Sequence, residues 1–81
     1  MFSPDRIREI VEKGLPGSRA EVKDLTGTSD HFELVVIAAG FDGKSLVDRH
    51  RMVYATLGAL VGNEIHALSI RALTPGEAGG R

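Results

Sequence analysis

Apolar residues recur at helical spacing near the start of the chain. Four of them lie three or four positions apart and would share one face of a helix: Ile7, Ile10, Val11 and Leu15. The preceding Ser3-Pro4-Asp5 is typical of a helix start, because serine caps free amides, proline fits the first turn and an acid complements the dipole. Gly14 and Pro16-Gly17 favour the end of the helix. The pattern predicts a first helix with one apolar stripe.

A second, longer stretch with the same period lies in the middle of the chain. Ser45 can cap its first turn, and Asp48 follows three positions later, as in a capping box. One helical face collects Leu46, His50, Val53, Leu57 and Leu60, broadened by Val47, Tyr54 and Val61. Gly62-Asn63 ends the pattern. We predict a main helix on which His50 is a buried histidine that ties the helix to a sheet.

Three segments have the composition of β-strands. Residues 20–25 alternate between apolar and charged, which is typical of a half-buried strand, whereas residues 32–38 are apolar on both faces, as in a central strand. Residues 65–70 repeat the central-strand pattern after the main helix. Residues 26–30 are a polar turn, so the first two strands make a hairpin. The order α-β-β-α-β predicts an α+β fold, with a three-stranded mixed sheet backed by helices.

The strand order predicts where the histidines lie. Two strands joined by a crossover helix normally run parallel, so the second and third strands should begin at the same edge of the sheet. His31 opens the second strand and His66 opens the third, and neighbouring strands are about 4.8 Å apart. We therefore expect the two imidazoles to emerge close together at that edge, with His50 toward the opposite end of the domain.

The C-terminal residues predict a short frayed segment. Thr74-Pro75-Gly76-Glu77 has the composition of another helix start, but Gly79-Gly80-Arg81 leaves such a helix no room to continue. A chain of 81 residues has room for one modest core. We expect a single domain over residues 1–76 and a disordered tail over residues 77–81.

Composition restricts the chemistry of the chain. The formal net charge of −1 gives no general attraction to nucleic acid, and without cysteine any metal would need histidine, carboxylates or a partner's thiolates. The N-terminal residues lack the apolar run of a signal peptide, and no stretch could span a bilayer, so we expect a cytoplasmic protein without membrane contact. Nucleophile-elbow, phosphate-loop and H-E-x-x-H motifs are absent, which favours a non-catalytic protein.

Several motifs resemble the signature of the BolA-like protein family. These are Phe41-Asp42-Gly43, the run R-H-R-M-V-Y at residues 49–54, I-H-A-L at residues 65–68, and T-P-G-E at residues 74–77. His31-Phe32 at the start of the second strand is also similar to the family. The resemblance implies a fold related to the class II K-homology domain, which agrees with the element order predicted above.

The resemblance also implies a function in iron–sulfur cluster assembly, trafficking or iron sensing. Family members pair with a monothiol glutaredoxin and share a [2Fe–2S] cluster with its cysteine and glutathione; the isolated chain, a monomer or weak homodimer, is expected to hold no cofactor. The family's histidine ligand is the one in I-H-A-L, here His66. The second ligand is usually a cysteine or histidine in the loop between the first two strands. Residues 26–30 contain neither, so His31 is the nearest candidate.

Other interpretations stay open for these residues. Without the resemblance, a histidine such as His66 at a strand end more often bonds a backbone carbonyl than a metal, and His31 is as easily a surface residue as a ligand. Imidazole can nevertheless replace thiolate on one iron, as in Rieske centres. Lys44, Arg49 and Arg51 are expected to be solvated charges or contacts for a partner or for phosphate. The alternative function is therefore a DNA-binding transcriptional regulator that uses the K-homology-like fold.

Overall fold

The computed structural model describes residues 3–25, 27, 31–62, 65 and 67–79. Within these ranges the main elements are α1 (Pro4–Gly14), β1 (Arg19–Asp24), β2 (His31–Ile37), α2 (Leu46–Leu57), β3 (Ala67–Leu73) and α3 (Pro75–Ala78). Two short 3₁₀ turns, Ala39–Phe41 and Gly58–Leu60, flank α2. The Ser3 hydroxyl accepts from the Arg6 N–H and the Ser45 hydroxyl from the Asp48 N–H, so both predicted N-caps are present.

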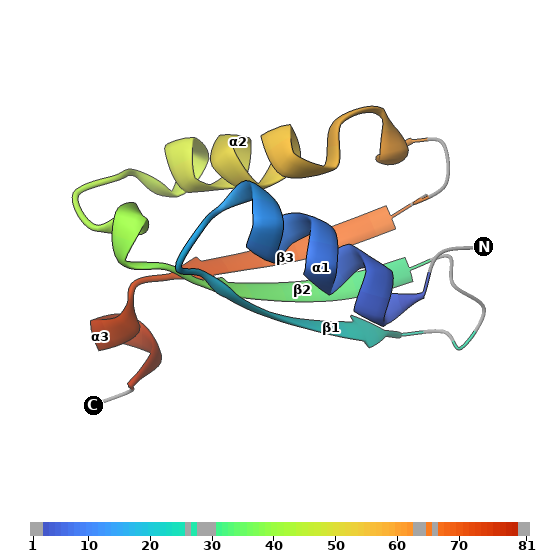
Figure 1. Ribbon diagram of the computed structural model, residues 1–81, viewed down its shortest axis with the longest axis horizontal. Coiled ribbons are helices and arrows are strands. Elements are labelled where there is room, and N and C mark those ends of the chain that lie inside the picture. Colours follow the sequence, from blue (N-terminus) through green and yellow to red (C-terminus); the bar gives the residue numbers. More distant parts are fainter. Residues whose placement is uncertain (1–2, 26, 28–30, 63–64, 66, 80–81) are drawn as a thin grey trace.

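The three strands form one mixed sheet in the order β1-β2-β3 (Figure 1). β1 pairs with β2 antiparallel as a hairpin, and β2 pairs with β3 in parallel through the crossover helix α2. The predicted fold class, element order and strand directions are thus confirmed.

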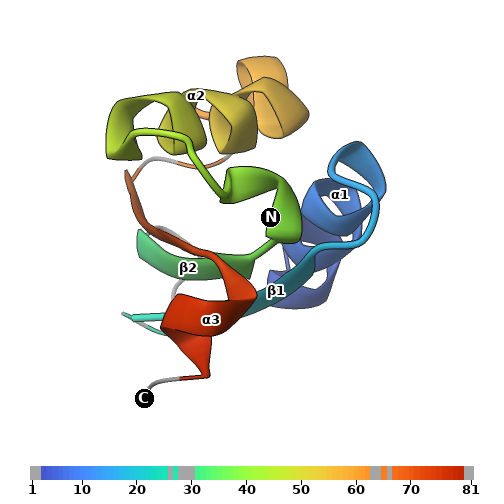
Figure 2. The ribbon, with the colours of Figure 1, turned by 90° about the vertical axis from the view of Figure 1, so that its left-hand side faces the viewer.

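Helices α1 and α2 lie on the same side of the sheet, with α1 against β1 and α2 against β3 (Figures 1 and 2). The core lies between the helices and this face of the sheet. Most of its side chains come from alternate strand positions and from one side of each helix, and Phe41 is fully buried in the turn before α2. The core residues are Ile7, Val11, Ala20, Phe32, Leu34, Val36, Ala38, Phe41, Val53, Leu57, Ile65 and Ala72. Positions between these on the strands face away from the helices.

The buried face of α2 differs from the predicted one. Arg49, Val53 and Leu57 are the buried residues of this helix, whereas His50 is only half-buried. Leu46 is 66% exposed, Val47 60% and Tyr54 41%. Residues four positions apart share a helical face, so the row through positions 49, 53 and 57 sets the rotation of α2 and turns Val47 and Tyr54 outward, whereas Leu46 is exposed as the first residue of the helix.

Two residues of the tail expected from the sequence, Glu77 and Ala78, belong to the short helix α3. Pro75–Ala78 form one helical turn, closed by a capping box in which the Thr74 hydroxyl accepts from the Glu77 N–H and the Glu77 carboxylate accepts from the Thr74 N–H. Two reciprocal hydrogen bonds thus order a segment that the glycines after it would otherwise leave frayed.

Gly14 allows α1 and α2 to approach closely. A Cβ atom on this residue would lie 2.5 Å from Cγ2 and 2.8 Å from Cβ of Thr56. The Thr56 hydroxyl donates to the Val53 carbonyl at 2.7 Å, which fixes its rotamer, so the side chain cannot easily move aside.

We expect Gly14→Ala to lower the free energy of unfolding by about 1–3 kcal/mol, because the added methyl group overpacks the helix crossing. Urea unfolding followed by circular dichroism measures this change. Gly40→Ala is the matched control, since an added Cβ there meets nothing within 4 Å. Equal stability of the two variants would show that the helices can separate without cost.

Candidate functional site

One of the two predicted ligand residues, His31, lies at the edge of the sheet where β2 and β3 begin. His31 is the first residue of β2, is exposed, and has Ala67 as its partner in the parallel register. Its carbonyl accepts from the Leu25 N–H at 2.8 Å, which extends the hairpin pairing to this point. His66 lies outside the described residues, as does the loop at 28–30. The structure thus places His31 opposite the residue that follows His66 in the chain.

An exposed imidazole at the rim of a sheet can serve as a terminal ligand for a metal presented by another molecule. Among the residues that the structure describes, no three histidine, cysteine, aspartate or glutamate side chains gather as a metal site. His31 therefore provides one exposed imidazole that could bind a metal presented by another molecule.

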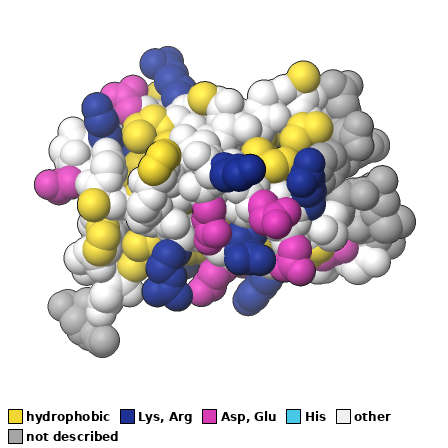
Figure 3. Space-filling view, viewed as in Figure 1, with side chains coloured by type: hydrophobic (Ala, Val, Ile, Leu, Met, Phe, Trp, Pro, Cys, Tyr) yellow, Lys and Arg dark blue, Asp and Glu magenta, His cyan; other side chains and the backbone are white. Residues whose placement is uncertain are grey.

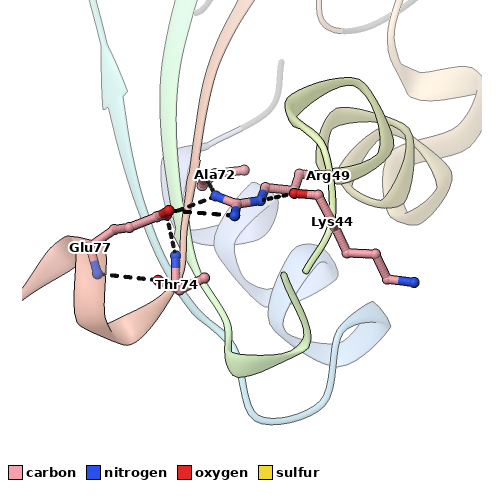
Figure 4. A network of polar contacts seen from close by, with 5 residues as sticks. All are labelled: Lys44, Arg49, Ala72, Thr74 and Glu77. Carbon is pink, nitrogen blue, oxygen red and sulfur yellow. Dashed lines mark hydrogen bonds and ion pairs between the residues drawn. The ribbon is translucent and has the colours of Figure 1, made fainter. Parts of the chain in front are cut away.

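Arg49 lies in the interior instead of on an exposed helical face, which corrects its expected place among the surface cations. Its guanidinium donates to the carbonyls of Lys44 and Ala72 at 3.0 and 3.1 Å, and its Nη1 lies 2.7 Å from a carboxylate oxygen of Glu77 (Figure 4). It also lies 6.0 Å from the centre of the Phe41 ring. Only 8% of Arg49 is exposed. The side chain thus ties α2 to β3, to α3 and to the turn before α2.

Glu77 completes this polar network from the C-terminal turn. The hydrogen bond from Arg49 holds the pKa of the Glu77 carboxyl below its ordinary value, and the Thr74 N–H adds to this effect. Sequence reasoning missed this residue as a partner of Arg49. The T-P-G-E run predicted a helix start, but nothing local connects it with a residue 28 positions earlier.

The other two predicted basic residues do lie on the surface. Arg51 has a side chain that is 78% exposed and a long ion pair, 3.9 Å, with Asp48 one turn earlier. The ammonium group of Lys44 extends away from the Arg49 network (Figure 4). On the face shown in Figure 3, basic and acidic side chains are interspersed. Of the three basic residues expected to contact solvent, a partner or phosphate, Lys44 and Arg51 are therefore exposed and Arg49 is not.

None of the helices in the described ranges combines the length and the apolar character needed to cross a bilayer.

Comparison with known proteins matches residues 9–77 to the family described as BolA-like protein. Human BolA-like protein 1 is 41% identical over 78 residues, which cover 88% of this chain and 57% of the human protein. This chain therefore spans little more than half of that relative.

Two solved structures show the same fold over nearly the whole chain. A bolA protein homologue from Coxiella burnetii superimposes with a TM-score of 0.85 at 36% identity, covering 98% of this chain and 99% of that one. The BolA domain of SufE1 from Arabidopsis thaliana gives a TM-score of 0.80 at 40% identity, covering 95% and 98%. With the family match over residues 9–77, these similarities show that the chain belongs to the BolA-like protein family.

Proposed function

We propose that this protein is a non-catalytic adaptor that pairs with a monothiol glutaredoxin and shares a [2Fe–2S] cluster with it, in cluster assembly, trafficking or iron sensing. Family membership supports this function, because the motif that carries His66 resembles the family's ligand segment. The occurrence of a BolA domain as part of SufE1 supports an adaptor role, because it shows that a domain of this kind can work as one part of a larger protein.

The observation that carries the proposal is the parallel register between β2 and β3. His31, exposed at the start of β2, has Ala67 as its partner, and His66 is the residue just before Ala67. This register supports the proposal that His66 provides a second donor near the end of the sheet where His31 lies. An iron–sulfur cluster needs four ligands, and this chain has no cysteine, so a partner would supply the thiolates and this chain the imidazole.

The proposal predicts that His66→Ala abolishes the cluster of the heterodimer. The wild type and the variant are each mixed with a monothiol glutaredoxin, glutathione, iron and sulfide, and visible absorption and circular dichroism spectra are compared. Loss of an imidazole ligand should leave only the spectrum that glutaredoxin gives by itself. Lys13→Ala, a change of an exposed residue on α1, is the control and should behave as the wild type.

His31→Ala asks whether this residue is the second ligand. A weakened or spectrally shifted cluster in this variant would assign His31 to the iron, and an unchanged spectrum would leave His66 as the imidazole ligand of this chain. A heterodimer cluster that is unaltered in His66→Ala would contradict the proposed function.

A further inference from the structure

The two outer edges of the sheet are protected to different degrees. At the β1 edge, the Ala20 N–H donates to a Glu12 carboxylate oxygen at 2.9 Å, so α1 covers part of this edge. β1 also carries exposed charges at Arg19, Glu21 and Lys23. Charged side chains and capped amides are devices that prevent another strand from pairing with an edge.

The β3 edge lacks most of these devices. The Ala38 N–H donates to the Leu73 carbonyl, so Leu73 faces β2, and by alternation the backbone groups of Leu68, Ile70 and Ala72 face outward. The Ala72 carbonyl already accepts a hydrogen bond from Arg49, so the outward groups of Leu68 and Ile70 remain for an added strand. No described strand pairs with this side of β3, whose sequence A-L-S-I-R-A-L has one charge, Arg71.

An exposed apolar flank of α2 lies above the same edge. Met52 and Thr56 lie on the side of α2 near α1, where Thr56 approaches Gly14, and the helical period places Val47 and Tyr54 on the opposite side. Because α1 lies against β1 and α2 against β3, that opposite side is the one nearest the β3 edge (Figure 2). Leu46, Val47 and Tyr54 are three of the four exposed large hydrophobic residues in the described ranges.

We infer that the β3 edge and this flank of α2 accept an extended segment of the partner protein as a fourth strand, an inference that rests on the proposed function. Strand addition uses outward backbone groups for affinity and alternate side chains for specificity. The added strand would pair with Leu68 and Ile70 and place apolar side chains beneath Val47 and Tyr54. Since β3 begins one residue after His66, the same contact brings the partner alongside the candidate ligand.

Arg71 specifies the charge of the added segment. It is exposed on the face of the sheet away from the helices, and its partner in β2 is Val35. Arg71 has no ion pair among the described residues, so an acidic residue beside it on the added strand would complement it. A second copy of this chain fits less well, because β3 contains no acidic residue to place opposite Arg71.

Amide hydrogen exchange tests the inference directly. The amides of Leu68 and Ile70 should become protected from exchange when iron-free monothiol glutaredoxin with glutathione is added. The amide of Val22, whose backbone N–H faces outward on β1, should exchange at an unchanged rate. A second arm uses a synthetic peptide of about eight residues that alternates valine and threonine around one glutamate. The same peptide with lysine for glutamate should bind more weakly.

Two variants separate docking from ligation. Leu68→Pro removes an outward amide that the fold does not use, and Arg71→Glu reverses the exposed charge; each should weaken binding of iron-free glutaredoxin roughly tenfold. Val22→Pro and Arg19→Glu are the matched controls on β1 and should bind as the wild type. His66→Ala should still bind iron-free glutaredoxin, so a failure of cluster ligation is distinguishable from a failure of docking.

Protection confined to Leu68 and Ile70 in the glutaredoxin arm would support the inference. Protection of these amides by the peptide but not by glutaredoxin would overturn the inference, as would protection elsewhere on the surface. Protection that rises with the concentration of this chain alone would also overturn it, because the occupant would then be a second copy of the chain.

Discussion

Arg49→Met is expected to lower the free energy of unfolding by about 2–3 kcal/mol, because hydrogen bonds from a charged donor are worth about 1.5–3 kcal/mol. The variant keeps the apolar stem of the side chain but leaves the carbonyls of Lys44 and Ala72 without their donor. It also removes the partner that holds Glu77 and α3 in place. Urea unfolding followed by far-ultraviolet circular dichroism measures the loss, since the chain has no tryptophan to report by fluorescence.

Arg51→Met is the matched control on the same helix. Its side chain is 78% exposed and forms only a long ion pair, so its replacement should change stability by less than about 0.5 kcal/mol. Equal losses for the two variants would contradict a structural role for Arg49.

The buried position of Arg49 also decides how DNA binding has to be tested. Arg49→Glu would place an acid next to the carbonyls of Lys44 and Ala72 and destabilise the fold, so a loss of DNA binding in that variant would carry no information. Lys44→Glu and Arg51→Glu alter exposed residues and leave this network intact. If DNA is a ligand, these two variants should weaken binding and reduce its dependence on salt.

The element order could be predicted because each element carries local signals. Ser3 and Ser45 cap their helices as their positions predicted, and the strand patterns gave the sheet with its parallel pair. The rotation of α2 could not be predicted, because its apolar residues cover more than one face. Arg49 selects the buried face through contacts with β3 and α3, and these exist only once the chain has folded.

The candidate site could be predicted only in part. Topology placed His31 at the shared rim, because parallel strands begin at one edge. The assignment of His66 as a ligand came from the motif around it and stays a prediction. The ion pair between Arg49 and Glu77 escaped prediction, because exposed arginine is the usual case and the two residues are 28 positions apart.

Glu77→Gln is expected to make the protein less stable at neutral pH and less sensitive to acid. Glutamine can still accept from the Thr74 N–H, so the capping box is retained while the charge beside Arg49 is lost. Urea unfolding of both proteins between pH 7 and pH 3 measures the difference in stability. Glu9→Gln, a change on exposed α1 whose ion pair is 3.9 Å long, is the control.

The sign of the pH dependence follows from the lowered pKa of Glu77. The folded protein holds this carboxyl below the ordinary value of 4.5, so the unfolded chain takes up the proton first as the pH falls. The stability from Glu77 is therefore fully present above pH 4.5 and is lost as the pH falls through the folded-state pKa. The gap between wild type and Glu77→Gln should then close in acid. A stability gap that stayed constant between pH 7 and pH 3 would contradict a stabilising role for the ionised Glu77 carboxylate beside Arg49.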